Sequence, residues 1–127
     1  MSKSLFILML SILGFIGCNA QRGSSIDSKE AYGLIKADSN IAILDVRTAK
    51  EFADGHVAGA VNIDVNQTDF AQKIDELDRS KTYIVYCRLG RRSRKAVGIM
   101  AAKGFKNLYN VSDGFVGWNK NGLPFEK

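Results

Sequence analysis

Short apolar segments alternate with amphipathic ones along most of this chain. Four segments of four or five residues, rich in β-branched and aromatic side chains, predict strands at 41–44, 60–63, 83–86 and 107–111. Because helix-like segments separate these strands, the pattern favours a mainly parallel sheet with helices on both faces. The sequence therefore predicts an α/β fold.

Four helices are predicted beside these strands, at 28–37, 48–55, 68–77 and 93–103. The first two begin with a capping-box pattern, in which Asp27 or Thr48 is followed three residues later by glutamate. The fourth has apolar residues at helical spacing and stops at Gly104, where a left-handed cap is easily formed.

The strand at 83–86 leads directly into Cys87 and a loop that contains Gly90. Reactive groups in parallel sheets lie at the carboxyl ends of strands, and the next predicted helix would direct its N-terminus at the sulfur. Helix N-termini and arginines lower a cysteine pKa to about 3.5–7.5, and glycine permits the left-handed angles of an anion-binding nest. Cys87 is therefore predicted to be a catalytic thiolate beside an anion site.

The residues expected to bind an anionic substrate surround this thiol: Arg88, Leu89, Gly90, Arg91, Arg92 and Ser93. Five cationic side chains and no acid lie between positions 88 and 95, so an anion would be attracted and oriented. The alternative, a buried structural cysteine before a solvated basic helix, accounts for neither the glycine nor the clustered arginines.

The run Cys-Arg-Leu-Gly-Arg-Arg-Ser at 87–93 resembles the active-site loop of rhodanese-like sulfurtransferases. Segments 45–63 and 113–118 are similar to that family's second and C-terminal signatures, and the resemblance spans about 26–124. It implies a rhodanese-like single domain in which sulfane sulfur passes from thiosulfate or a similar anionic donor to a thiol or protein acceptor. The resemblance implies a Cys87 persulfide as the intermediate, with no cofactor.

Departures from the family pattern leave the donor and acceptor open. Ala58 stands where the family usually has proline, and Leu89 and Arg91 occupy variable loop positions. Four residues separate Cys87 from Arg92, as in the smaller loop of sulfurtransferases, whereas related phosphatases and arsenate reductases have one more. Sulfur transfer is favoured. A lipid-anchored persulfide carrier with little turnover, and a Cys-dependent phosphatase or arsenate reductase, are the alternatives.

Other polar residues near the predicted strand ends have a structural interpretation. Asp45 and Arg47 resemble an acid–base pair, but we expect them to pair with neighbours such as Lys50 or Glu51 and so fix their loop. Glu51 is expected to cap a helix.

The remaining candidates are a histidine and two aromatic residues. His56 is the only histidine and is expected in a structural turn, which disfavours a Cys–His protease and a metal site. Phe115 and Trp118 are expected in the core or in a pocket wall.

The amino-terminal segment has a different character. Lys3 precedes an unbroken apolar or small stretch at 4–17, too short for a membrane-spanning helix of roughly 20 residues. Residues 15–18 resemble a bacterial lipoprotein cleavage box, which implies lipidation of Cys18; conventional cleavage near Ala20 is the alternative. We expect a signal peptide at 1–17, a tether at 18–25 and a rhodanese-like domain at 26–127.

This organisation predicts an exported protein, periplasmic or in the cell envelope, held at a membrane by its lipid. The chain of 127 residues with 46% hydrophobic content is enough for one compact domain. Its formal charge of +5 is too modest to indicate a nucleic-acid partner. Lipidation of Cys18 would leave Cys87 as a lone thiol in an oxidising compartment, which favours a reactive role.

Overall fold

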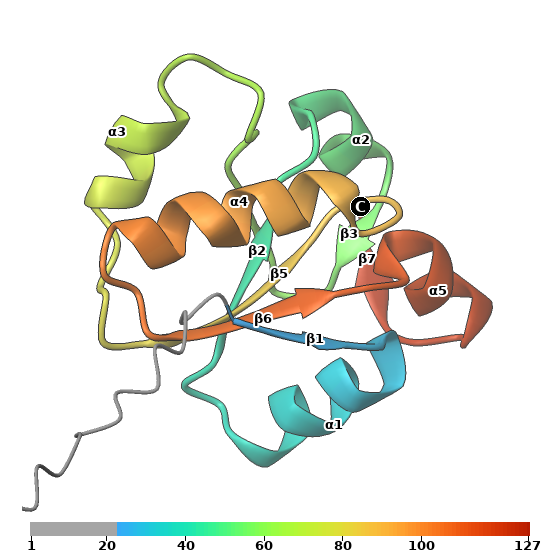
Figure 1. Cartoon of the computed structure of the whole chain (residues 1–127). Coiled ribbons are helices and arrows are strands. Elements are labelled where there is room, and N and C mark those ends of the chain that lie inside the picture. The colour runs from blue at the N-terminus through green and yellow to red at the C-terminus, as the bar shows by residue number, and fades with distance from the viewer. Residues whose placement is uncertain (1–22) are drawn as a thin grey trace, which may run out of the picture.

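The computed structural model describes residues 23–127 and contains a five-stranded parallel sheet (Figure 1). The strand order is β1-β6-β5-β2-β4, and every neighbouring pair is parallel. The strands are β1 (Ser24–Ile26), β2 (Ala42–Asp45), β4 (Val61–Asn62), β5 (Thr82–Tyr86) and β6 (Asn107–Val111). The predicted α/β architecture is confirmed.

Four of the five helices within residues 23–127 overlap the predicted ones, and the helix at 114–120 was not predicted. The helices are α1 (Ser28–Ala37), α2 (Ala49–Asp54), α3 (Phe70–Asp75), α4 (Arg91–Ala102) and α5 (Gly114–Lys120). Asp27 accepts a hydrogen bond from the first turn of α1, and Thr48 forms a complete capping box on α2. α4 begins two residues before the predicted start, because Gly90 takes the left-handed conformation at the N-cap and turns the chain directly into the helix.

The core has two halves, one on each face of the sheet. β5 alternates between them, since successive strand residues point to opposite faces. Tyr83, Val85 and the adjoining Cys87 pack in the cluster that includes residues of α3 and α4. Ile84 and Tyr86 pack in the cluster that includes residues of α1 and α5. Figure 1 shows these helices covering opposite faces, and the predicted two-sided coverage is confirmed.

Two strand pairings were missed by the sequence prediction. Ser24 and Ser25, which we assigned to the tether, belong to β1 and pair with β6, so the folded part begins before residue 26. A second, antiparallel sheet joins β3 (His56–Val57) to β7 (Phe125–Glu126), where only a turn was expected around His56.

The predicted signal peptide at 1–17, the lipidation site at Cys18 and most of the tether lie outside the described residues. Within 23–127, no helix combines the length and apolar character needed to cross a membrane.

Candidate active site

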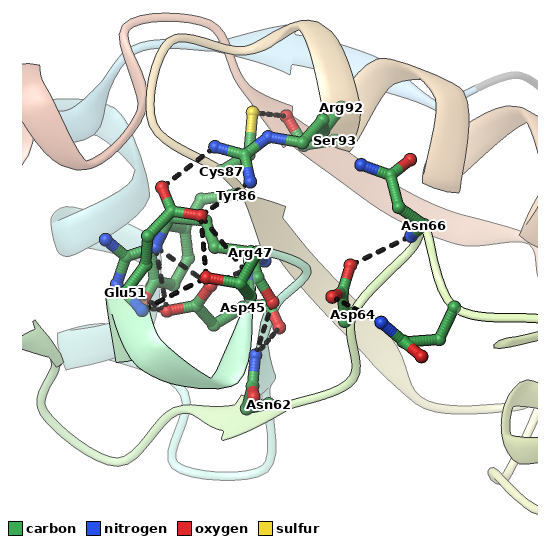
Figure 2. Close-up of polar contacts among 12 residues, drawn as sticks. Asp45, Arg47, Glu51, Asn62, Asp64, Asn66, Tyr86, Cys87, Arg92 and Ser93 are labelled. Atoms are coloured by element: carbon green, nitrogen blue, oxygen red, sulfur yellow. Dashed lines mark hydrogen bonds and ion pairs between the residues drawn. The ribbon is translucent and has the colours of Figure 1, made fainter. Parts of the chain in front are cut away.

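The end of β5 delivers Cys87 to the start of α4, and its side chain is enclosed by the following loop. The residue is 1% exposed. Its Sγ accepts a hydrogen bond from the Gly90 N–H at 3.1 Å and lies 3.4 Å from Ser93 Oγ (Figure 2). The twelve-residue helix α4 begins at Arg91, so its positive N-terminal end adjoins the sulfur. Of the predicted loop residues, Gly90 and Ser93 therefore contact the thiol directly.

These contacts favour the ionised thiol. Burial raises the pKa of Cys87, because desolvation disfavours the charged form. The Ser93 hydroxyl and the backbone N–H groups of Ser93, Gly90 and Leu89 outweigh burial and leave the pKa below the ordinary thiol value. The loop therefore stabilises a thiolate on a nearly buried sulfur.

The first turn of α5 holds the Cys87 loop in this orientation through two backbone hydrogen bonds. The Phe115 N–H donates to the Cys87 carbonyl at 2.8 Å, and the Val116 N–H donates to the Arg88 carbonyl at 3.2 Å. Because the C=O and N–H of one peptide point in opposite directions, fixing the Arg88 carbonyl towards α5 turns the Leu89 N–H towards the sulfur. Sequence reasoning placed Phe115 in the core or a pocket wall and missed this backbone contact.

Two glycines make this close packing possible. Gly90 and Gly114 both have positive φ, 91° and 55°, which L side chains rarely adopt. A Cβ on Gly90 would collide with the Ser112 carbonyl, and one on Gly114 would collide with the carbonyls of Cys87 and Arg88. The loop and α5 therefore meet through bare backbone.

Asp113, the residue before α5, links that helix to α1. Its carboxylate accepts hydrogen bonds from the Ser28 N–H and the Ser28 hydroxyl, both at 2.8 Å. Asn121 donates to the same hydroxyl at 2.9 Å. The segment Asp113–Phe115 thus connects the Cys87 loop, α5 and α1.

Arg92 forms a bidentate ion pair with Glu51. Its Nη1 and Nη2 donate to Glu51 Oε1 and Oε2 at 2.7 and 3.0 Å (Figure 2). The Arg92 hydrogen bond, helped by Thr48 and opposed by burial, lowers the pKa of Glu51 to about 2. The expected cap role of Glu51 is confirmed. The pairing with Arg92, 41 positions away, was missed because no local sequence signal points to it.

The other loop residues lie at the rim of the site. Arg88 and Arg91 are exposed and form no ion pair within residues 23–127. Leu89 is 54% exposed. A shallow cavity of about 270 Å³ opens beside the loop, and its lining includes Arg88, Glu51 and Phe115. The expectation of a pocket wall at Phe115 is confirmed.

Asp45 and Arg47 form a buried structural pair, but with each other. Arg47 Nη2 and Nε donate to the Asp45 carboxylate at 2.8 and 3.0 Å, and Arg47 also donates to the Gly55 carbonyl at 2.7 Å. The Tyr86 hydroxyl donates to Asp45 at 2.6 Å. The expected partners were wrong: Glu51 binds Arg92, and Lys50, which is exposed, pairs with an acid one turn along α2. Burial makes the mutual pair necessary, because an uncompensated charge there is costly.

His56 and Trp118 serve packing. His56 stacks on Phe52 with ring centroids 3.6 Å apart, and its Nδ1 lies 2.8 Å from the Phe52 carbonyl oxygen. Trp118 is 3% exposed, and its indole N–H donates to the Pro124 carbonyl at 2.7 Å. The expected core position of Trp118 is confirmed.

The sequence and fold of this chain are similar to those of known proteins. The family model described as the rhodanese-like domain matches residues 27–121. Thiosulfate sulfurtransferase GlpE of Actinobacillus succinogenes is 34% identical over 103 residues, which is 81% of this chain and 90% of that protein. Thiosulfate sulfurtransferase 16, chloroplastic, of Arabidopsis thaliana is 33% identical over 111 residues, 80% of this chain and 91% of that protein. The crystal structure of a rhodanese-related protein from Thermoplasma volcanium is similar with a TM-score of 0.71 at 31% identity, covering 81% and 97% of the two chains.

Proposed function

Since this chain belongs to the rhodanese-like domain family, and relatives at about a third identity are named thiosulfate sulfurtransferases, we propose that it is a rhodanese-type sulfurtransferase working through a Cys87 persulfide. Thiosulfate or a similar anion is the donor, and a small thiophile, a thiol or a protein is the acceptor. The observation that carries the proposal is the Cys87 sulfur, ringed by N–H donors at the N-terminus of α4.

In the first step the Cys87 thiolate attacks the outer sulfur of thiosulfate. A sulfur–sulfur bond forms to Cys87, the bond between the two sulfurs of thiosulfate breaks, and its electron pair leaves with sulfite. One negative charge remains on the terminal persulfide sulfur, and sulfite carries two. The N–H groups of Leu89 and Gly90 would stabilise the charge on the sulfur, while Arg88 and Arg91 at the rim would attract the dianion.

In the second step a nucleophile takes the terminal sulfur and returns Cys87 to the thiolate. With cyanide, a carbon–sulfur bond forms, the persulfide bond breaks towards Cys87, and thiocyanate departs. The burial of Cys87 supports sulfur chemistry over phosphate chemistry, because the residue is 1% exposed. The N–H groups of the loop form a small ring around the Cys87 sulfur. A single projecting sulfur atom can enter this ring more easily than a tetrahedral oxyanion.

The test is intact mass spectrometry of the full chain after incubation with thiosulfate, followed by cyanide. We expect a gain of one sulfur atom, then its loss with release of one equivalent of thiocyanate. The full chain also contains Cys18, so Cys87→Ser is the matched control and should gain no sulfur. Uptake by that variant, or no uptake by the wild type, would overturn the proposal.

Sulfur loading, combined with two activity assays, separates the alternatives. Full loading with no catalytic turnover would identify a persulfide carrier that needs a dedicated partner. Rapid hydrolysis of an aryl phosphate without sulfur loading would identify a phosphatase. For location, we propose on sequence alone that Cys18 is lipidated and that the domain is held at the cell envelope.

A further inference from the structure

Glu51 is the acidic side chain that binds an arginine of the Cys87 loop. Both carboxylate oxygens accept hydrogen bonds from Arg92, which is the second residue of α4. The two side chains are only 27% and 30% exposed. A bidentate pair of this kind fixes the plane of the guanidinium as well as its distance.

The Glu51 carboxylate is itself held in place. Oε1 accepts from the Thr48 N–H and the Thr48 hydroxyl, both at 3.1 Å, in addition to Arg92. Thr48 follows the buried pair at the end of β2 by one residue. A rigid strand end therefore positions Thr48, Thr48 positions Glu51, and Glu51 positions Arg92.

The pair is also the only hydrogen-bonded link between α2 and α4 in residues 23–127. Without it, Arg92 would be a long side chain on the first turn of a helix, free to extend into solvent. Figure 2 shows the guanidinium between the Glu51 carboxylate and the Cys87 sulfur. The Glu51 hydrogen bond raises the pKa of Arg92, and the charge of Cys87 raises it further, so Arg92 and the sulfur interact electrostatically.

We propose that Glu51 is a positioning residue for sulfur transfer: it holds the Arg92 guanidinium beside Cys87, where the positive charge stabilises the sulfur and the departing anion. The inference rests on the proposed function. An arginine placed before the reaction needs no reorganisation as charge develops, which is the condition for efficient electrostatic stabilisation. Helix capping alone would need neither the second carboxylate oxygen nor the negative charge.

Glu51→Gln separates the two roles, because glutamine also serves in a capping box but lacks the charge. We expect the variant to take up one sulfur per chain, as the wild type does, with the rate of loading by thiosulfate about tenfold lower. The fall should appear in kcat more than in KM, since the interaction strengthens in the transition state. Rates are normalised to the fraction of chains that load, which removes any effect of misfolded protein.

Glu30→Gln is the matched control. Glu30 stands three residues after the α1 cap, as Glu51 does on α2, but α1 covers the other face of the sheet (Figure 1). This variant should load at the wild-type rate. Arg92→Gln completes a double-mutant cycle, in which Glu51→Gln should add nothing to the loss caused by Arg92→Gln.

Three results with these variants would overturn the inference. Wild-type loading rates in Glu51→Gln would assign Glu51 to capping alone, and an equal loss in Glu30→Gln would show a general effect of charge. Multiplicative losses in the double variant would show that Glu51 does not act through Arg92. These leave the proposed function intact, whereas a wild type that takes up no sulfur removes both proposals.

A measurement on the wild type tests the position of the Arg92 guanidinium directly. Nitrogen-15 NMR of the guanidinium groups should show restricted rotation for the buried Arg47 and for Arg92, whose signal is assigned by its absence in Arg92→Gln. A freely rotating Arg92 guanidinium contradicts the proposed positioning.

Discussion

Removing the Ser93 hydroxyl is the most direct test of how the loop ionises its thiol. Ser93 is fully buried on the first turn of α4, with Oγ 3.4 Å from the Cys87 sulfur. It is the only side chain in residues 23–127 that hydrogen-bonds the sulfur. Ser93→Ala deletes that interaction and leaves the Ser93 backbone N–H, which also favours the thiolate.

The expected shift follows from the strength of a hydrogen bond to a charged group. Such bonds contribute about 1.5–3 kcal/mol, and one pKa unit corresponds to about 1.4 kcal/mol. The long contact of 3.4 Å indicates the lower end of that range. We therefore expect Ser93→Ala to raise the pKa of Cys87 by about one unit. Reactions of the thiolate should slow about tenfold at a pH below both pKa values.

The assay is the rate of alkylation by iodoacetamide as a function of pH, in full chains that also carry Cys18→Ser. The midpoint reports the pKa of Cys87 alone. Ser112→Ala is the matched control, because its exposed hydroxyl donates to the Ile26 carbonyl, away from the sulfur. A midpoint in Ser93→Ala equal to the wild-type one, or below it, would refute the reasoning.

Three further outcomes are expected. Gly114→Ala should lower the free energy of unfolding in urea by about 2–4 kcal/mol, and more than Gly122→Ala, which has positive φ but open space around it; equal losses would contradict the packing argument. The pKa of Glu51 lies at about 2 instead of 4.5, so the stabilising effect of its carboxylate is complete above pH 4.5 and is lost as the pH falls to about 2. The free energies of unfolding of wild type and Glu51→Gln should therefore differ by roughly 1–2 kcal/mol at neutral pH and converge near pH 2. A difference that stays constant between pH 4.5 and pH 2 argues against the shift. Cys18→Ala should abolish incorporation of labelled palmitate in a bacterial host without changing thiosulfate–cyanide turnover, and label in this variant would show that Cys18 is not the lipid site.

Elements set by local chemistry could be predicted from the sequence. The cap at Asp27 and the capping box at Thr48 each define the start of a helix within a few residues. The apolar run before Cys87 defines the central strand and places the thiol at its carboxyl end. These signals lie between neighbours in the chain, so no knowledge of the fold is needed to interpret them.

Elements set by distant partners could not be predicted. β1 is short, polar and partly exposed, and only its pairing with β6 makes it a strand. β3 and β7 lie far apart in the sequence, and each becomes a strand only by pairing with the other. The Glu51–Arg92 pair also joins separate elements. In these cases several partners of suitable charge or pattern exist, and only the folded chain selects one.

The two backbone contacts from α5 to the loop also bear on how the protein is made. The donors belong to Phe115 and Val116, which follow the whole cysteine loop in the chain. A growing polypeptide that has emerged only as far as Cys87 carries the thiol but lacks the donors that orient its surroundings. The orientation of the loop therefore depends on residues added after Cys87, and shortened products ending before Gly114 should react as ordinary thiols despite containing the whole cysteine loop.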